Sequence, residues 1–160
     1  MSVKEKFTPE EWKNLLKAPM LAAYAVAGSA PSKKDDFIKE MAAVADGIVE
    51  GEQRAPKSSL LGEVVAEIIA NAEDEQRGQT EKLSLDDARS RALDTCRAAA
   101  AAVEAKANPE EAYEYKRWVL VVAEKVAAAA KEGGFFGFGG EQISGGEIAT
   151  INEIGEAIKI

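Results

Sequence analysis

The stretch that decides the fold runs from Asn108 to Gly133 and reads NPEEAYEYKRWVLVVAEKVAAAAKEG. It opens with a helix-start signal, because Asn108 can cap the helix and Pro109 suits its first turn. Its centre is apolar on nearly all sides, and Gly133 is a common kind of helix stop. The run from Val119 to Ala123 would also suit a strand. The flanking helix formers, the cap and the length instead predict a helix, the longest in the chain.

Similar signals on both sides of this stretch predict further helices. The clearest pattern spans Leu60 to Ala72, where apolar residues share one face and Glu63 and Glu67 lie opposite. Seven helices are expected, and they begin near Thr8, Met20, Ser32, Ser58 or Ser59, Ser84, Asn108 and Ser144.

Two interruptions are expected between these helices. The residue before a proline avoids the helical region, so Ala18-Pro19 should separate the first helix from the second. The segment from Gly51 to Pro56 is expected to form a polar loop. With mostly short connections and no convincing strand, the pattern predicts an all-α fold, a compact bundle of about seven helices in a single domain over residues 1–160.

The charge balance restricts the class of partner. The chain has 20 Lys and Arg residues against 28 Asp and Glu residues, a net charge of −8. Nucleic acids and anionic membranes are bound by clustered positive charge, so neither is an expected partner. No apolar run reaches the ~18 residues of a membrane span, and the first residues do not resemble a signal peptide. We expect a cytoplasmic protein, without membrane insertion, that binds a protein partner or forms a homo-oligomer.

The residues available for chemistry are few. Histidine is absent, which excludes His-based general bases and most zinc sites. The single cysteine, Cys96, lies in an apolar helical stripe and is expected to be a buried packing residue. No second catalytic group lies near Glu124 at a spacing that would indicate an active site. We therefore interpret Glu124 as a solvated or lysine-paired carboxylate. No catalytic and no cofactor-binding residue is assigned, and an enzyme is not expected.

The segment from Gly133 to Gly140 is the part of the chain that helix packing alone does not explain. It holds five glycines and three phenylalanines, Phe135, Phe136 and Phe138. A phosphate-binding loop would need a preceding strand and a following Lys-Ser or Lys-Thr pair, and both are missing. We expect the phenylalanines to fold back over the bundle; exposed, they would form a protein-contact surface.

Acidic residues around the same segment are the only grouped candidates for a metal site. Glu132, Glu141 and Glu147 could supply oxygen ligands to calcium or magnesium. Their spacing is not that of an EF-hand, and Ser144 with Glu147 is equally explained as a capping box. No cofactor is therefore predicted, while a divalent cation stays an open alternative.

Two places in the chain share one arrangement, a helix rich in alanine, a glycine stop, a serine cap and an amphipathic helix. The first combines Ala25–Gly28 with Ser32–Ile38, and the second combines Ala127–Gly133 with Ser144–Ile151. This double hairpin resembles the TerB-like family of bacterial helical domains associated with tellurite resistance. The family's acidic residue beside the turn glycine is matched by Glu132 in the second copy only.

The resemblance implies a function as well as a fold. It implies a non-enzymatic helical domain that acts through protein contacts, in a bacterial stress response such as tellurite or metal resistance. The alternative is a sensor that binds a small molecule or a divalent cation at the loop of residues 132–147.

Overall fold

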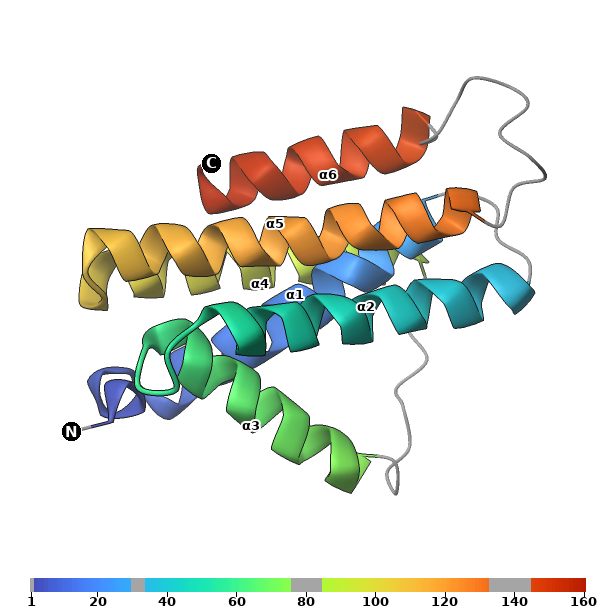
Figure 1. Cartoon of the computed structure of the whole chain (residues 1–160). Coiled ribbons are helices and arrows are strands. Elements are labelled where there is room, and N and C mark those ends of the chain that lie inside the picture. Colours follow the sequence, from blue (N-terminus) through green and yellow to red (C-terminus); the bar gives the residue numbers. More distant parts are fainter. Residues whose placement is uncertain (1, 30–33, 76–84, 133–144) are drawn as a thin grey trace.

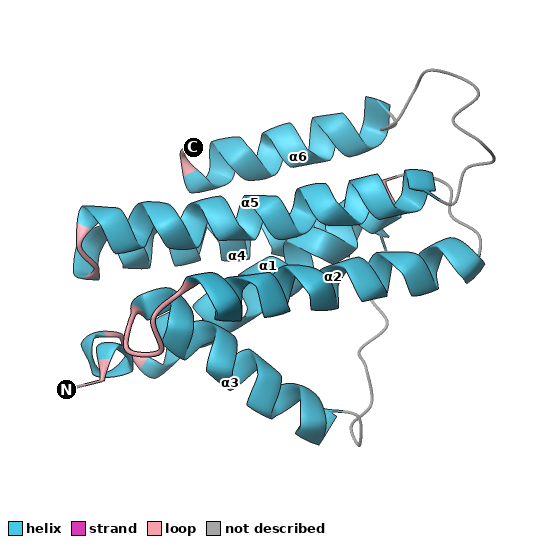
Figure 2. Cartoon of the chain, in the orientation of Figure 1, coloured by secondary structure: helices cyan, strands magenta, loops and turns pink. Residues whose placement is uncertain are grey.

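The structure, a computed structural model that describes residues 2–29, 34–75, 85–132 and 145–160, is built from helices (Figure 2). The elements are the 3-10 helix η1 (Val3–Lys6) and the α-helices α1 (Pro9–Gly28), α2 (Lys34–Arg54), α3 (Leu60–Glu75), α4 (Leu85–Lys106), α5 (Pro109–Glu132) and α6 (Gly145–Ile158). The all-α prediction is confirmed, with six α-helices in the described ranges in place of about seven. None of these helices combines the length and apolarity needed to cross a membrane.

Together with α1, helix α5 forms the centre of the bundle. It contacts each of the other five α-helices, whereas α6 lies along one side of the bundle and α3 diverges from the other (Figure 1). Its inward residues, including Tyr115, Val119, Val122 and Val126, are almost completely withdrawn from solvent. The apolar burial that stabilises the bundle is therefore organised around α5 and α1.

The expected break at Ala18-Pro19 is wrong, because α1 continues through Pro19 to Gly28. Proline has no N–H, so the carbonyl oxygen of Leu15, four residues earlier, cannot receive its usual helical hydrogen bond from position 19. The hydroxyl group of Tyr115 on α5 donates to this oxygen at 2.8 Å. A neighbouring helix thus supplies the bond that proline removes.

The helix starts follow the expected caps. The Thr8 side chain accepts a hydrogen bond from the Glu11 N–H while the Glu11 carboxylate accepts one from the Thr8 N–H, which completes a capping box. The Asn108 side chain accepts from the Glu111 N–H at 2.8 Å. Local sequence is sufficient to place these two helix starts.

The end of α2 differs from the expected polar loop over Gly51 to Pro56. The helix continues to Arg54, and Gly51 is buried in it. A Cβ atom at Gly51 would lie 2.6 Å from Nε1 of Trp118, so α2 and α5 approach each other closely there. Tertiary packing extends the helix past a residue that commonly ends one.

Cys96 confirms the expectation of a buried packing residue. Its side chain is completely buried, and its Sγ lies 4.0 Å from the carbonyl oxygen of Ala18. Burial raises the pKa of Cys96 to about 12, although Arg97 acts in the opposite direction. The thiolate is the reactive form of cysteine, and it is scarcely populated at neutral pH.

We therefore expect the native protein not to react with Ellman's reagent at pH 8 over the minutes in which an exposed thiol reacts fully. The same sample in guanidinium chloride should release one equivalent of thionitrobenzoate per chain, since unfolding exposes Cys96. Absorbance at 412 nm measures both. Full and rapid reaction of the native protein would contradict the buried position of this thiol.

Candidate functional site

A half-open groove lies between α2, the start of α3 and α5, with a volume of about 320 Å³. We call it the α2–α5 groove. Its lining residues are Gly47, Glu50, Gly51 and Arg54 from α2, Leu61 from α3, and Glu110, Tyr113, Glu114, Arg117, Trp118 and Val121 from α5. It combines an apolar floor with charged side chains, which is the usual composition of a binding site.

The floor is fixed by the close contact of α2 with α5. The indole N–H of Trp118 donates a hydrogen bond to the carbonyl oxygen of Gly47 at 2.9 Å. Gly47 and Gly51 lie one helical turn apart on the same face, so the indole rests directly on the α2 backbone. Leu61 is buried beside them. The floor is consequently rigid, because the indole has both packing and hydrogen-bond partners.

One side of the groove carries charges that already have partners. The Lys125 ammonium group lies 2.7 Å from Oε2 of Glu50, and Arg54 pairs with the other oxygen of the same carboxylate. The hydrogen bond from Lys125, with a smaller contribution from Arg54, holds the pKa of Glu50 below its ordinary value. Both oxygens of the Glu50 carboxylate are therefore occupied within the protein, and the three side chains together carry one positive charge.

The other side offers an exposed aromatic ring beside two carboxylates. Tyr113 is 60% exposed, a large value for an aromatic side chain that lines a hollow. Glu110 and Glu114 flank it on α5, and neither forms an ion pair with a described residue. Arg117 is turned toward Glu124, with 3.9 Å between the charged atoms. The groove can therefore accept an apolar side chain against Tyr113 and a positive charge against Glu110 and Glu114.

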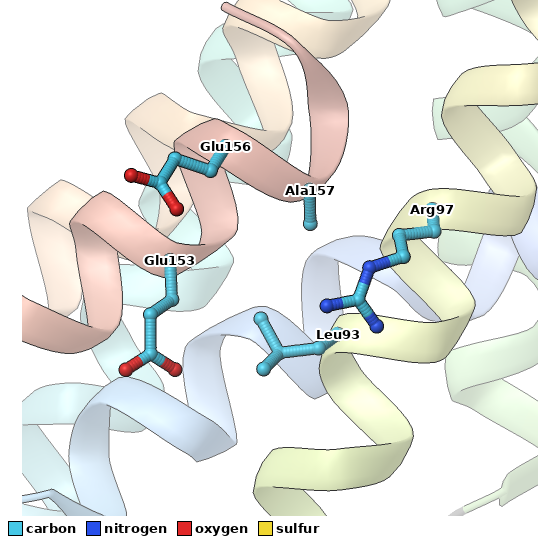
Figure 3. A pocket seen from close by; sticks show the side chains of 5 residues that line it. All are labelled: Leu93, Arg97, Glu153, Glu156 and Ala157. Carbon is cyan, nitrogen blue, oxygen red and sulfur yellow. The ribbon is translucent and has the colours of Figure 1, made fainter.

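A second hollow of about 250 Å³ lies between α4 and α6. Figure 3 shows Leu93 and Arg97 of α4 facing Glu153, Glu156 and Ala157 of α6 across it. Arg97 pairs with Asp94 on its own helix at 3.1 Å. This hollow has only Leu93 and Ala157 as apolar lining, so it is a seam between two helices with a charged rim rather than a built site.

Most of the predicted site residues lie outside the described part of the structure. This applies to Glu141 and to the three phenylalanines, Phe135, Phe136 and Phe138, while Glu132 is placed only as the last residue of α5. The metal and protein-contact hypotheses for these residues stay predictions. No three His, Cys, Asp or Glu side chains gather as metal ligands within the described residues.

Glu147 is the predicted ligand whose side chain is described. It is 1% exposed and lies in the first turn of α6, where a carboxylate complements the positive end of the helix dipole. The preceding Gly146 packs on the end of α1, since a Cβ atom there would lie 2.5 Å from the carbonyl oxygen of Ser29. Glu147 is thus positioned where α6 meets α1.

Sequence reasoning treated Tyr113 and Trp118 only as members of a long apolar helix and did not find the groove. The available signal was the pair Gly47 and Gly51, whose spacing of four allows another helix to approach closely. Glu124 is half-exposed and is paired with an arginine, Arg117, not with a lysine.

No protein-family model matches the chain, and comparisons with curated proteins and with solved structures give no significant match.

Proposed function

We propose that this chain is a non-enzymatic, cytoplasmic helical domain of the TerB-like kind that acts through protein contacts, in a stress response such as tellurite or metal resistance. The observation that carries the protein-contact part is the α2–α5 groove, which has the largely exposed Tyr113 on one side and the buried Trp118 in its floor. Tyrosine and tryptophan are enriched among the residues that dominate binding energy at protein interfaces.

The arrangement of the helix ends supports the TerB-like part of the proposal. Helices α1 and α5 end at the same side of the bundle, and α2 and α6 begin there (Figure 1). The two sequence hairpins that resemble one another therefore turn at one end of the molecule. This is the arrangement that a duplicated hairpin would have.

The charges around Tyr113 define the kind of segment that fits. Glu110 and Glu114 provide negative charge on one side, whereas Glu50 is already neutralised by Lys125 and Arg54. The groove suits a peptide segment that places an apolar side chain on Tyr113 and a lysine or arginine beside the two glutamates.

A photo-crosslinking amino acid at position 113 tests this proposal in the cells that make the protein. We expect a specific adduct with a partner protein, mapped by mass spectrometry to a segment with an apolar residue and a nearby lysine or arginine. The same amino acid at the exposed Ala98 of α4 is the matched control and should give no such adduct. The Glu110→Lys/Glu114→Lys variant should lose most of the position-113 adduct.

The purified pair supplies the magnitude. Tyr113→Ala is expected to weaken the partner's affinity by about tenfold or more, because truncation of an aromatic anchor costs about 2 kcal/mol at such interfaces. Isothermal titration calorimetry with the mapped peptide measures the change. Equal labelling at positions 113 and 98, or equal affinity of the Tyr113→Ala variant, would contradict the proposal.

A further inference from the structure

One face of α2 carries an exposed apolar stripe on the side away from the bundle. Its members are Ile38, Ala42, Ala45 and Val49, and Ile38 and Val49 are 67% and 45% exposed. The spacing of four, three and four residues places all four side chains within an arc of roughly 60° at 100° per residue. This is the spacing of the a and d positions of a coiled coil.

The stripe lies opposite the residues that attach α2 to the rest of the protein. Gly47 and Gly51 are buried against α5, roughly 120–180° around the helix from Ala42 and Ala45. The four side chains of the stripe therefore do not pack in the core. An apolar row with this regular spacing on an exposed helix face indicates a surface on which another helix packs.

The charges beside the stripe identify that partner. Lys39 and Asp46 are exposed on the same flank, and neither is paired with a described residue. Two copies of α2 can align antiparallel, with Ile38 over Val49 and Ala42 over Ala45 of the second copy. In this alignment the side of α2 that carries Lys39 and Asp46 faces the same side of the second copy. Lys39 of each copy then lies about 3 Å along the axis from Asp46 of the other, two positions at 1.5 Å per residue.

The geometry points to a second copy of this chain as the occupant of the stripe, in a two-fold symmetric, antiparallel α2–α2 dimer. Such an interface is self-complementary, and it forms the Lys39–Asp46 pair twice. A parallel alignment would bring this flank against Met41 and Ile48, which offer no opposite charge. Ala42 and Ala45 at the centre allow the helices to approach closely.

The size of the stripe sets the expected strength. It extends over about 16 Å of helix, so it buries less than the roughly 1,200–2,000 Å² of stable complexes. The dimer should therefore be reversible, with a micromolar or weaker dissociation constant. None of the four stripe residues lines the α2–α5 groove, so this surface does not depend on the proposed function, and Tyr113 variants should leave the dimer unchanged.

Sedimentation equilibrium on the full chain, from micromolar to millimolar concentration, tests the dimer. The average mass of the native protein should rise from 17.0 kDa toward twice that value. Ala45→Glu should raise the dissociation constant by about tenfold or more, since it places two like charges at the centre of the contact. Ala98→Glu on the exposed face of α4 is the matched control and should leave the mass unchanged.

Charge exchange tests the antiparallel register. Lys39→Asp and Asp46→Lys should each weaken the dimer by roughly threefold to tenfold, because each substitution creates two like-charge contacts. The Lys39→Asp/Asp46→Lys double variant should recover most of the loss. Thermal unfolding confirms that each variant is folded. A constant 17.0 kDa mass, a dimer unaffected by Ala45→Glu, or a double variant as weak as the singles would overturn the inference.

Discussion

The Gly51→Ala variant is expected to lose about 1–3 kcal/mol of unfolding free energy, although it adds only one methyl group. The added Cβ would lie 2.6 Å from Nε1 of Trp118, closer than such atoms approach. The indole would have to move, and its hydrogen bond to the Gly47 carbonyl would be weakened. Overpacking costs about 1–3 kcal/mol and a lost hydrogen bond about 1 kcal/mol, which outweigh the gain of about 1 kcal/mol in helix propensity.

Urea unfolding followed by circular dichroism measures this loss, and the melting temperature should fall by about 2–12 °C. Gly145→Ala is the matched control, because a Cβ atom there meets nothing within 4 Å. The control should be neutral or slightly stabilising. Equal stability of the two variants would show that α2 and α5 are not in close contact at Gly51.

The Tyr115→Phe variant is expected to lose about 1–3 kcal/mol, although it removes only one oxygen atom. The Tyr115 hydroxyl is buried and donates to the carbonyl oxygen of Leu15, which Pro19 leaves without a helical partner. Burial raises the pKa of Tyr115 well above its ordinary value, with a smaller effect of Cys96, so the phenol keeps its proton. Without the hydroxyl, a buried carbonyl group would stay unsatisfied.

Tyr113→Phe removes the same atom from an exposed ring on the same helix and should leave the stability unchanged. Pro19→Ala provides a sharper test, because residue 19 then has an N–H that can donate to Leu15. In that background Tyr115→Phe should cost markedly less than in the native chain. A double-mutant cycle from urea unfolding measures the coupling, and additive effects would contradict the role of Tyr115.

The sequence was sufficient for the parts of the fold that depend on neighbouring residues. Two helix starts are set by local hydrogen bonds, between Thr8 and Glu11 and between Asn108 and Glu111. These starts can therefore be predicted from the local sequence. The apolar periods of α3 and α5 identify buried faces for the same reason. The break expected at Pro19 is absent because the compensating hydrogen bond to Leu15 comes from Tyr115, 100 positions beyond Leu15 in the chain.

The candidate site was less predictable than the fold. The groove exists because Gly47 and Gly51 of α2 meet Trp118 of α5, and one sequence read alone does not show which helices become neighbours. The exposed stripe of Ile38, Ala42, Ala45 and Val49 shows the same difficulty. A helical period reveals that apolar residues share faces, but not which face the core covers.

The sequence by itself determined the all-α class, most helix starts and the buried role of Cys96. These follow from spacing, capping and composition, which act over a few residues. Only the tertiary structure decided that α1 continues through Pro19, that α2 extends to Arg54, and that Tyr113 overlies an open groove. Each of these depends on contacts between helices distant in sequence, where packing overrides the local preference of a proline or a glycine.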